Sequence, residues 1–335
     1  MTELDYLYAR ILTTTACNAR CDYCYEKGTP LMRMDARTAE QTARFITDQL
    51  CDFGTANLEW FGGEPTLNPE AADLICRKLQ DADIRYRSSI VTNGLLLRSC
   101  LTEERIALWN LRRVQVTLDG PEQEHEAAKQ FPQGAFDRIL DNAQTCADRG
   151  LFVKLRLNYG ENDAALKELI DALHARFSVS ERVHAYIVPL YSCEHSFSRP
   201  LMLRALALSK RLTEAGLADP DALFNLRERD SRCFMMTPSG FTIAPDGHLY
   251  NCSHNMSAEQ CVGSVWNYHA DNPIRLAFLR GEPSQECNQC KAYPICKGGC
   301  RIGELGLAEM PQCHPYRSIL SEILSIKNGF DQTSV

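Results

Sequence analysis

Short apolar runs bounded by turn residues recur along residues 1–190 and predict six β-strands. These runs lie at Tyr6–Thr13, Leu58–Phe61, Ser89–Thr92, Val114–Leu118, Phe152–Leu157 and Val183–Val188. Several of them end at glycine, proline or Asn-Gly, the residues that commonly terminate strands. Between the strands, apolar positions recur with the spacing of a helix face. The helical segments are expected at 35–51, 69–79, 102–109, 136–149 and 163–177.

Regular strand–helix alternation is typical of an α/β fold with parallel strands and right-handed crossovers. Six units are too few for a complete eight-fold barrel, so we expect a partial (β/α)6 barrel. The last strand has no crossover helix directly after it. A helix at 199–215 is expected to link this barrel to the C-terminal part of the chain.

The pattern changes at Cys233, where glycine and proline become frequent and cysteines set the spacing. We therefore expect a barrel domain at 1–195, a helical linker at 196–232, a cysteine-rich domain at 233–315, and a terminal helix with a tail at 316–335. An apolar stretch at 319–326 predicts that this last helix packs on the barrel.

Composition adds one unusual feature, which is sixteen cysteines in 335 residues. Thirty-six basic and forty-three acidic residues give a net charge of −7, which does not favour a nucleic-acid surface. No run of eighteen apolar residues and no signal peptide is present, so we expect a cytoplasmic protein without a membrane partner. Because disulfides are rare in the cytoplasm, many of these cysteines are expected to be metal ligands.

The first cysteine cluster is Cys17-x3-Cys21-x2-Cys24, directly after the first strand. The loops at the carboxyl ends of barrel strands are where such folds place active sites. Three thiolates on one loop can each hold one iron of a [4Fe–4S] cluster and leave the fourth iron open. A zinc site would require a fourth donor, and none is near in the sequence.

This loop, with an aromatic residue before its third cysteine, resembles the signature of the radical S-adenosylmethionine (radical SAM) family. Gly62-Gly63-Glu64-Pro65, Thr92-Asn93-Gly94 and Thr117-Leu118-Asp119-Gly120-Pro121 resemble, in order, the family's segments after strands two, three and four. The resemblance implies that Cys17, Cys21 and Cys24 hold the catalytic cluster. It also implies the residues that contact SAM, which are Tyr23, Gly62, Gly63, Glu64, Pro65, Thr92, Asn93, Thr117 and Asp119.

Other residues of these segments have simpler interpretations. Glycines at positions 62 and 63 would let the backbone approach a ligand, although a plain turn is the alternative. Tyr25 is expected to pack in the core. His125 either belongs to the site or is a surface histidine at a helix start. Lys129 keeps a positive charge but not the planar fork of the arginine found in relatives, so we leave it out of the site.

The second cluster, Cys287-x2-Cys290-x5-Cys296-x3-Cys300, resembles the SPASM domain of radical SAM enzymes that modify peptides and proteins. The resemblance implies two auxiliary iron–sulfur clusters, expected to be of the [4Fe–4S] type. One would take Cys287, Cys290, Cys296 and Cys313. The other would take Cys233, Cys252 and Cys300, with either Cys261 or an open iron at the fourth position. Seven cysteines do not divide into regular tetrahedral zinc sites, which argues against a structural zinc domain.

The five remaining cysteines are isolated, and buried, inert thiols are expected for them: Cys51, Cys76, Cys100, Cys146 and Cys193.

The resemblance implies reductive cleavage of SAM to a 5′-deoxyadenosyl radical that removes hydrogen from a substrate. The first hypothesis is maturation of a ribosomally made peptide by a thioether or carbon–carbon crosslink. Sixteen residues before Cys17 are too few for a leader-recognition domain, so a separate protein or the catalytic domain is expected to recognise the peptide. A flavodoxin- or ferredoxin-like protein is expected to donate the electron.

Three alternatives remain open. A sulfatase-maturing, formylglycine-forming enzyme is the first, although relatives of that type usually have aspartate where this chain has Ser253. A peptide epimerase is the second, with Cys193 or Cys261 as hydrogen donor. An electron-carrying iron–sulfur protein is the non-enzyme alternative, and a cluster with an open iron argues against it.

Overall fold

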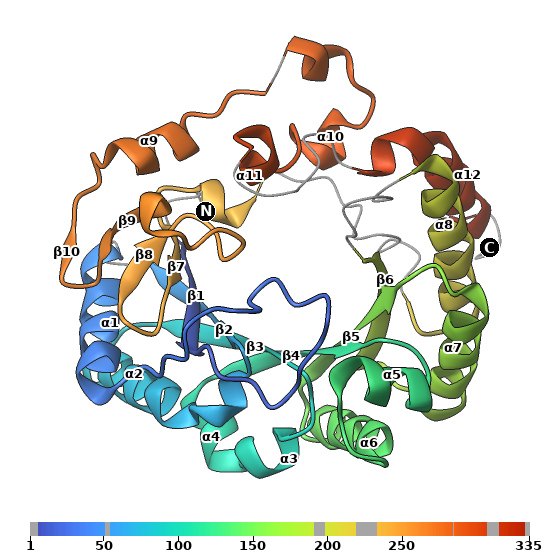
Figure 1. Ribbon diagram of the computed structural model, residues 1–335, viewed down its shortest axis with the longest axis horizontal. Coiled ribbons are helices and arrows are strands. Elements are labelled where there is room, and N and C mark those ends of the chain that lie inside the picture. The colour runs from blue at the N-terminus through green and yellow to red at the C-terminus, as the bar shows by residue number, and fades with distance from the viewer. Residues whose placement is uncertain are drawn as a thin grey trace.

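A curved sheet of six parallel strands forms the body of the protein (Figure 1). The computed structural model describes residues 6–50, 54–190, 198–218, 233–283, 285–306 and 315–331, so Cys51, Cys193 and Cys313 lie outside the described residues. The strands are β1 (Tyr6–Thr14), β2 (Thr55–Gly62), β3 (Tyr86–Thr92), β4 (Leu111–Leu118), β5 (Phe152–Tyr159) and β6 (Val183–Pro189). Their order follows the chain, as the partial-barrel prediction requires.

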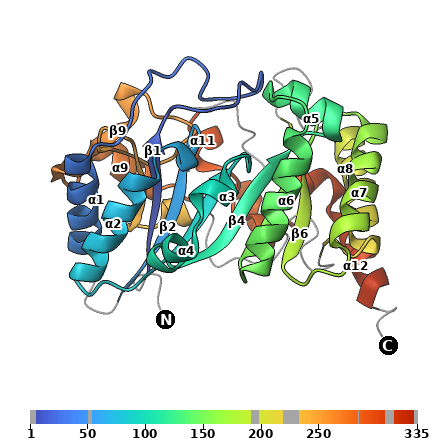
Figure 2. The same cartoon turned by 90° about the horizontal axis from the view of Figure 1, so that it is seen from below.

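Helices cover the outer, convex face of this sheet (Figures 1 and 2). They are α1 (Ala36–Gln49), α2 (Pro69–Asp81), α3 (Leu97–Cys100), α4 (Glu103–Leu108), α5 (Glu122–Lys129), α6 (Ala135–Asp148), α7 (Asp163–Phe177) and α8 (Arg199–Glu214). Local signals start several of them: Asp35 caps α1 by accepting from the Thr38 backbone N–H, and Thr102 caps α4 in the same way. The five expected helices are all present.

The two faces of each strand differ sharply. On β1, Leu7, Ala9 and Ile11 are buried against the helices, whereas Tyr8 and Arg10 face the lumen of the barrel. Because side chains alternate along a strand, the same division recurs on all six strands. The outer face is therefore apolar, and the lumen is lined largely by polar and charged residues.

Helix α8 packs in the core of the barrel as well as linking it to the C-terminal region. Leu201, Met202 and Ala205 are buried in the same apolar core as the barrel strands. The chain then returns to the sheet, where the Ala185 N–H donates to the Leu217 carbonyl at 2.7 Å. This helix thus takes the place of the crossover helix that the sequence pattern left unassigned after the sixth strand.

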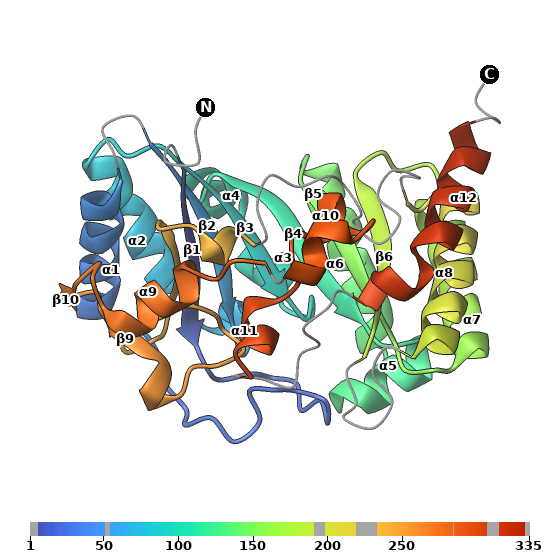
Figure 3. The ribbon, with the colours of Figure 1, turned by 90° about the horizontal axis from the view of Figure 1, so that it is seen from above.

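The C-terminal region continues the same sheet. Strand β7 (Gly240–Ile243) pairs in parallel with β1, and β8 (His248–Tyr250), β9 (Cys261–Ser264) and β10 (Asn267–Tyr268) follow as an antiparallel meander. The helices α9 (Pro273–Leu279), α10 (Tyr293–Cys296), α11 (Arg301–Glu304) and α12 (Leu320–Asp331) complete the chain. This region spans the open side of the barrel (Figures 1 and 3). Ile319 and Ile323 are buried in the barrel core, as we expected of the terminal helix.

One buried arginine fixes the cysteine-bearing loops of this region. Arg275 on α9 is fully buried, and its guanidinium donates to the carbonyls of Thr237, Pro238 and Gly240 at 2.8–3.1 Å. It also donates to the Asn251 side chain at 2.7 Å. Arg275 therefore ties the segment after Cys233 to the residue before Cys252.

No helix within the described ranges is long and apolar enough to cross a membrane.

We expect Arg275→Met to lower the free energy of unfolding by about 3 kcal/mol, because buried acceptors would lose their charged donor. Urea denaturation measures the change. Arg280→Met, at an exposed position at the end of the same helix, is the matched control and should have little effect. Equal stability of the two variants would contradict the role assigned to Arg275.

Candidate active site

The ends of β1 and β2 meet with almost no space between their backbones. A Cβ added to Gly63 would lie 2.4 Å from the Ala16 carbonyl oxygen, and one added to Gly62 would lie 2.2 Å from that of Thr14. The N–H of Gly63 donates to Thr14 O at 3.0 Å. The close approach seen here is to the cysteine loop itself, and the contact of these glycines with SAM stays a prediction. Gly62 also has a φ of +126°, which other residues rarely adopt.

Glu64 joins the ends of two strands, β2 and β3, through one buried carboxylate. Its Oε1 accepts from the N–H and hydroxyl of Thr66 and from the Thr92 hydroxyl at 2.6–3.1 Å. Its Oε2 accepts from the Asn93 N–H at 2.8 Å. Burial raises the pKa of Glu64, and these hydrogen bonds oppose that rise. The carboxylate therefore holds the segments after β2 and β3 together, and Oε2 keeps capacity for another donor.

The cysteine loop crosses the carboxyl ends of the strands (Figures 1 and 2). The Asn93 amide donates to Asn18 Oδ1 at 2.7 Å and lies 3.9 Å from Cys17 Sγ. Burial raises the pKa of the Cys17 thiol to about 11, with further contributions from Glu64 and from the thiols of Cys21 and Cys24. The three thiols are thus electrostatic neighbours at the predicted edge of the barrel.

This donor set fits the predicted cluster in chemistry, since it offers three thiols on one short loop. Within the described residues, no three or more His, Cys, Asp or Glu side chains are already gathered as a metal-binding group. The ligand assignment of Cys17, Cys21 and Cys24 therefore stays a prediction.

A buried ion pair lies beside this loop. Asp119 and Lys129 are nearly inaccessible, and Lys129 Nζ lies 2.8 Å from Asp119 Oδ2. Lys129 also donates to the Tyr23 hydroxyl at 2.9 Å, and Asn158 donates to Asp119 Oδ1 at 2.6 Å. Burial alone would raise the pKa of Asp119, but Lys129 and the hydrogen bonds hold it below its usual value. Lys129, which we left out of the site, thus joins two predicted cofactor-binding residues.

His125 is completely buried and is not a surface histidine. Its Nδ1 accepts from the Asp119 backbone N–H at 3.1 Å, so the neutral ring carries its proton on Nε2. Burial lowers the pKa of His125 to about 4; Lys129 lowers it further, while Asp119 and Glu126 oppose the shift. His125 supports the backbone of the Asp119 segment.

A second group of thiols lies in the C-terminal region. Burial raises the pKa of Cys252 to about 11, and the thiols of Cys233 and Cys300 add to the shift. These three cysteines, distant in sequence, are therefore neighbours in the structure. The thiol of Cys261 donates to the Gly263 carbonyl at 3.2 Å.

The other expected auxiliary ligands follow one another on short turns. The Cys290 N–H donates to Cys287 O at 3.1 Å, and Cys296 ends helix α10. Cys313 is outside the described residues. Cys76, Cys100 and Cys146 are buried, which confirms the expectation of buried thiols for those three.

Two contacts connect the barrel with the segment that carries Cys252, one from the cysteine loop and one from β1. The ring of Tyr25 stacks on His254, with centroids 4.5 Å apart and planes 16° apart, and His254 Nδ1 lies 3.9 Å from Cys252 Sγ. Arg10 on β1 donates to Ser253 Oγ at 2.8 Å and pairs with Glu59 at 2.5 Å. The expectation that Tyr25 packs in the core was wrong, because it is half-exposed and stacks on His254.

Sequence reasoning missed His254 and Arg10 as residues of this site. His254 stands two positions after Cys252, a spacing that could have indicated it. Arg10 interrupts the apolar pattern of the first strand at a position facing the lumen. The remaining predicted residues, Pro65 and Thr117, lie where expected, at the ends of β2 and β4.

We expect the stability of the protein to fall between pH 6.5 and pH 4 as His125 is forced to accept a proton. The folded-state pKa is below the unfolded value, so the unfolded chain binds the extra proton first and stability is lost as pH falls. His125→Asn should remove on the order of 3 kcal/mol of this dependence, by the size of the shift. Urea denaturation across the window measures it, with exposed His269→Asn as the control. An unchanged pH profile in the His125 variant would contradict the assignment.

Comparison with known proteins identifies residues 11–173 as a match to the radical SAM superfamily. "GTP 3′,8-cyclase 2" of Pseudomonas aeruginosa is 24% identical over 92% of this chain and 83% of its own length. The "serine-type anaerobic sulfatase-maturating enzyme" of Klebsiella aerogenes is 23% identical over 95% of this chain and 85% of its own length.

Solved structures with the same fold cover nearly the whole chain. One is anSMEcpe with bound AdoMet and a peptide, with a TM-score of 0.69, 16% identity and coverage of 96% of this chain and 99% of that one. Another is Streptococcus suis SuiB bound to the precursor peptide SuiA, with a TM-score of 0.64, 14% identity and coverage of 93% and 75%. Both likenesses extend through the C-terminal region.

A radical SAM domain implies SAM and a [4Fe–4S] cluster as cofactors, which agrees with the three thiols at the carboxyl edge of the barrel. The partial barrel, the ordered motifs and the cysteine-rich extension that closes it all agree with this domain. The protein is therefore an enzyme that carries a radical SAM domain at residues 11–173, and its C-terminal extension has the same fold as the corresponding parts of the anSMEcpe and SuiB structures.

Proposed function

We propose that this enzyme modifies a ribosomally made peptide by removing hydrogen and closing a thioether or carbon–carbon crosslink. The observation that carries the proposal is the Tyr25–His254 contact, which places the thiols of Cys252 and its neighbours against the loop of Cys17, Cys21 and Cys24. An auxiliary cluster held beside the catalytic cluster can bind a group of the substrate or accept an electron from the substrate. A simple electron carrier would not require an open iron next to a lumen.

Cys17, Cys21 and Cys24 would hold the cluster, and that cluster with SAM would supply the radical chemistry that removes hydrogen from the substrate. The chain's own residues hold the reactants. Lys129 and Asp119 fix the Tyr23 side of the cysteine loop, and Glu64 fixes the Asn93 side. Thr117 offers a hydroxyl on the lumen face of β4.

A peptide substrate is supported by two structures with the same fold, since anSMEcpe and SuiB were each solved with a peptide bound. In this chain a cavity of about 1120 Å³ opens into the lumen, which is room for an extended peptide segment. An electron donor of the flavodoxin or ferredoxin type completes the proposal.

Sulfatase maturation by formylglycine formation is the second candidate, because two relatives named "serine-type anaerobic sulfatase-maturating enzyme" match nearly the whole chain. Ser253 weighs against it. Its hydroxyl accepts from Arg10, so the position that is usually aspartate in such enzymes belongs here to a different polar network. Epimerisation remains a further alternative, with Cys193 or the half-buried Cys261 as hydrogen donor.

The first test uses the variant with Cys17, Cys21 and Cys24 all changed to Ala. Anaerobically prepared wild-type enzyme should hold about twelve iron atoms, the content of three four-iron clusters, and the variant about eight. With dithionite, wild type should convert SAM to 5′-deoxyadenosine and the variant should not. Colourless wild-type protein with stoichiometric zinc would overturn the proposal, and 5′-deoxyadenosine from the variant would overturn the assignment of the active cluster.

The reaction itself is read by mass spectrometry on a short Cys- or aromatic-rich peptide encoded beside the gene. A crosslink removes two hydrogen atoms and joins two residues, so fragment ions between them disappear. Formylglycine formation leaves the backbone fragments intact and removes sulfur when the target is cysteine. Epimerisation leaves the mass unchanged in ordinary water. Either of the last two results would contradict the crosslinking proposal.

We propose that the fourth position of the cluster held by Cys233, Cys252 and Cys300 is open. Cys261→Ala should then keep its iron, whereas Cys300→Ala should lose up to about four irons. The electron paramagnetic resonance signal of the Cys261 variant should shift only when a thiol-bearing peptide is added. Iron loss from Cys261→Ala without peptide would show that Cys261 is the fourth ligand instead.

A further inference from the structure

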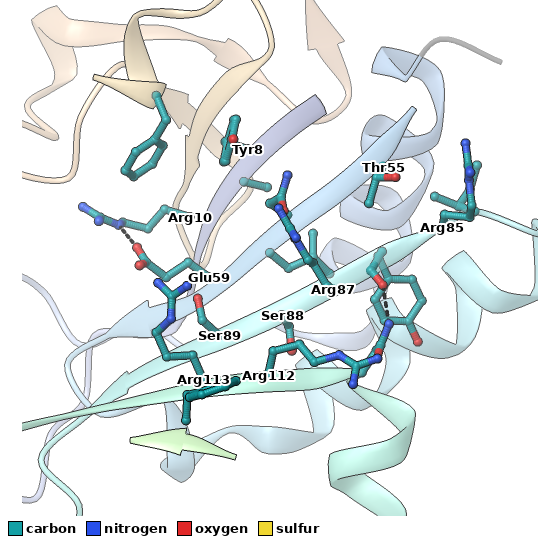
Figure 4. Close-up of a pocket in the computed structure, with 18 of the residues that line it drawn as sticks. Tyr8, Arg10, Thr55, Glu59, Arg85, Arg87, Ser88, Ser89, Arg112 and Arg113 are labelled. Carbon is teal, nitrogen blue, oxygen red and sulfur yellow. Dashed lines mark hydrogen bonds and ion pairs between the residues drawn. The ribbon is translucent and has the colours of Figure 1, made fainter. Parts of the chain in front are cut away.

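We propose that the lumen of the barrel binds an acidic segment of the peptide substrate through arginines. The central arginine lies about four residues along its strand from the predicted SAM end of the barrel. This inference rests on the proposed peptide-modifying function and names the class of peptide. It starts from the cavity of about 1120 Å³, which is lined from β1 to β4 and extends to the amino-terminal ends of the strands (Figure 4).

The charge of this lumen is strongly one-sided. Side-chain alternation on the six strands places five arginine or lysine residues and one acidic residue on the lumen face of the described chain. The basic residues are Arg10, Arg87, Arg113, Lys154 and Arg156, and the acidic residue is Glu59. In each strand, the residues directly before and after these six charged residues are buried on the helix side. The one exception is Arg112, which precedes Arg113. The protein as a whole carries a charge of −7, so this concentration of positive charge is local.

The single carboxylate neutralises only part of this charge. Glu59 pairs with Arg10 at 2.5 Å. Arg87 donates to the neutral amide of Asn57, and Arg156 donates to the neutral amide of Asn158 at 3.1 Å. Within the part of the chain that the structure describes, neither of these two guanidinium groups is in an ion pair. Hydrogen bonds to amides orient them and leave their charge uncompensated.

Arg113 lies at the centre of this group. Figure 4 shows its side chain pointing from β4 toward Glu59 and Arg10, with Arg87 projecting from the neighbouring strand. No ion pair of Arg113 occurs among the described residues. Like charges held within one cavity repel each other, and an anion between them removes the repulsion. The planar guanidinium fork suits a carboxylate, which it can bind with two hydrogen bonds.

The distance from this group to the chemistry follows from strand geometry. Arg113 and Thr117 lie on the same face of β4, four residues apart, with Thr117 at the predicted SAM end. At about 3.3 Å per residue this is roughly 13 Å. An extended peptide has a similar rise, so a carboxylate bound at Arg113 would place the residue about four positions away beside the cysteine loop. We therefore expect an Asp or Glu about four positions from the modified residue.

The test measures binding of a hexa-aspartate peptide to the holoenzyme by calorimetry, without SAM or reductant. Hexa-asparagine serves as the neutral peptide of equal shape. Hexa-aspartate should bind, its affinity should fall with added salt, and hexa-asparagine should bind at least tenfold more weakly. Arg113→Gln and Arg87→Gln should each weaken hexa-aspartate binding about tenfold, the usual loss of one charge-assisted hydrogen-bonded contact.

Arg98→Gln, at an exposed position on the outer helix α3, is the matched control and should bind hexa-aspartate as wild type does. Arg113→Glu extends the test, because it should abolish hexa-aspartate binding while circular dichroism reports its folding. Equal affinity for the two peptides, or no loss in the lumen variants, would overturn the inference. Binding of GTP that is tighter than that of hexa-aspartate and lost in the same variants would also overturn it in favour of a nucleotide. Because binding needs no radical chemistry, a failure here is distinct from a failure to form 5′-deoxyadenosine.

Discussion

The contact between Gly62-Gly63 and the start of the cysteine loop is the constraint on which the site depends. Two backbones meet there with no room for a Cβ, and the adjacent Glu64 N–H donates to the Ala16 carbonyl at 2.8 Å. The Glu64 side chain then reaches the end of β3, where Asn93 lies against Asn18 and Cys17. A buried carboxylate that accepts several hydrogen bonds is costly to disturb. The position of the first cysteine is thus set by three strand ends rather than by the loop alone.

The C-terminal region covers the open side and the exposed sheet edge that the partial barrel leaves. A six-stranded curved sheet leaves an open side and an edge at β1, and exposed edges tend to pair with other chains. Strand β7 covers that edge in parallel register, with Tyr8 opposite Gly240. The same addition brings the thiols of Cys233 and Cys252 close to each other, with Arg275 bridging their loops. Closure of the barrel and placement of the second thiol group are therefore one structural event.

Much of this organisation could be predicted from sequence, and the main exceptions are contacts between distant residues. The six strands, their helices and the cysteine spacing are local patterns, and the strands at 114–118 and 183–188 differ from the structure by only a few terminal residues. The pairing of β7 with β1 joins residues more than 200 positions apart, and no local pattern carries that information. The contact of His254 with Tyr25 also joins residues more than 200 positions apart, so only the spacing of His254 from Cys252 could have indicated it. Lys129 was left out because lysine lacks the planar fork of arginine, and its ion pair with Asp119 shows that the charge alone is enough to place it here.

The predicted SAM-binding residues and the arginine proposed to bind the substrate lie at different positions along one strand, β4. Thr117 and Asp119 stand at the carboxyl end of β4, where the cysteine loop crosses, while Arg113 stands deeper in the lumen. Because a strand is stiff and its rise per residue is fixed, the distance between these positions does not depend on loop conformation. Sites built on regular elements hold their geometry better than sites on loops. A substrate held by its charge at Arg113 would therefore meet the radical at a defined residue, so strand geometry rather than contact with the reacting side chain would choose the position modified.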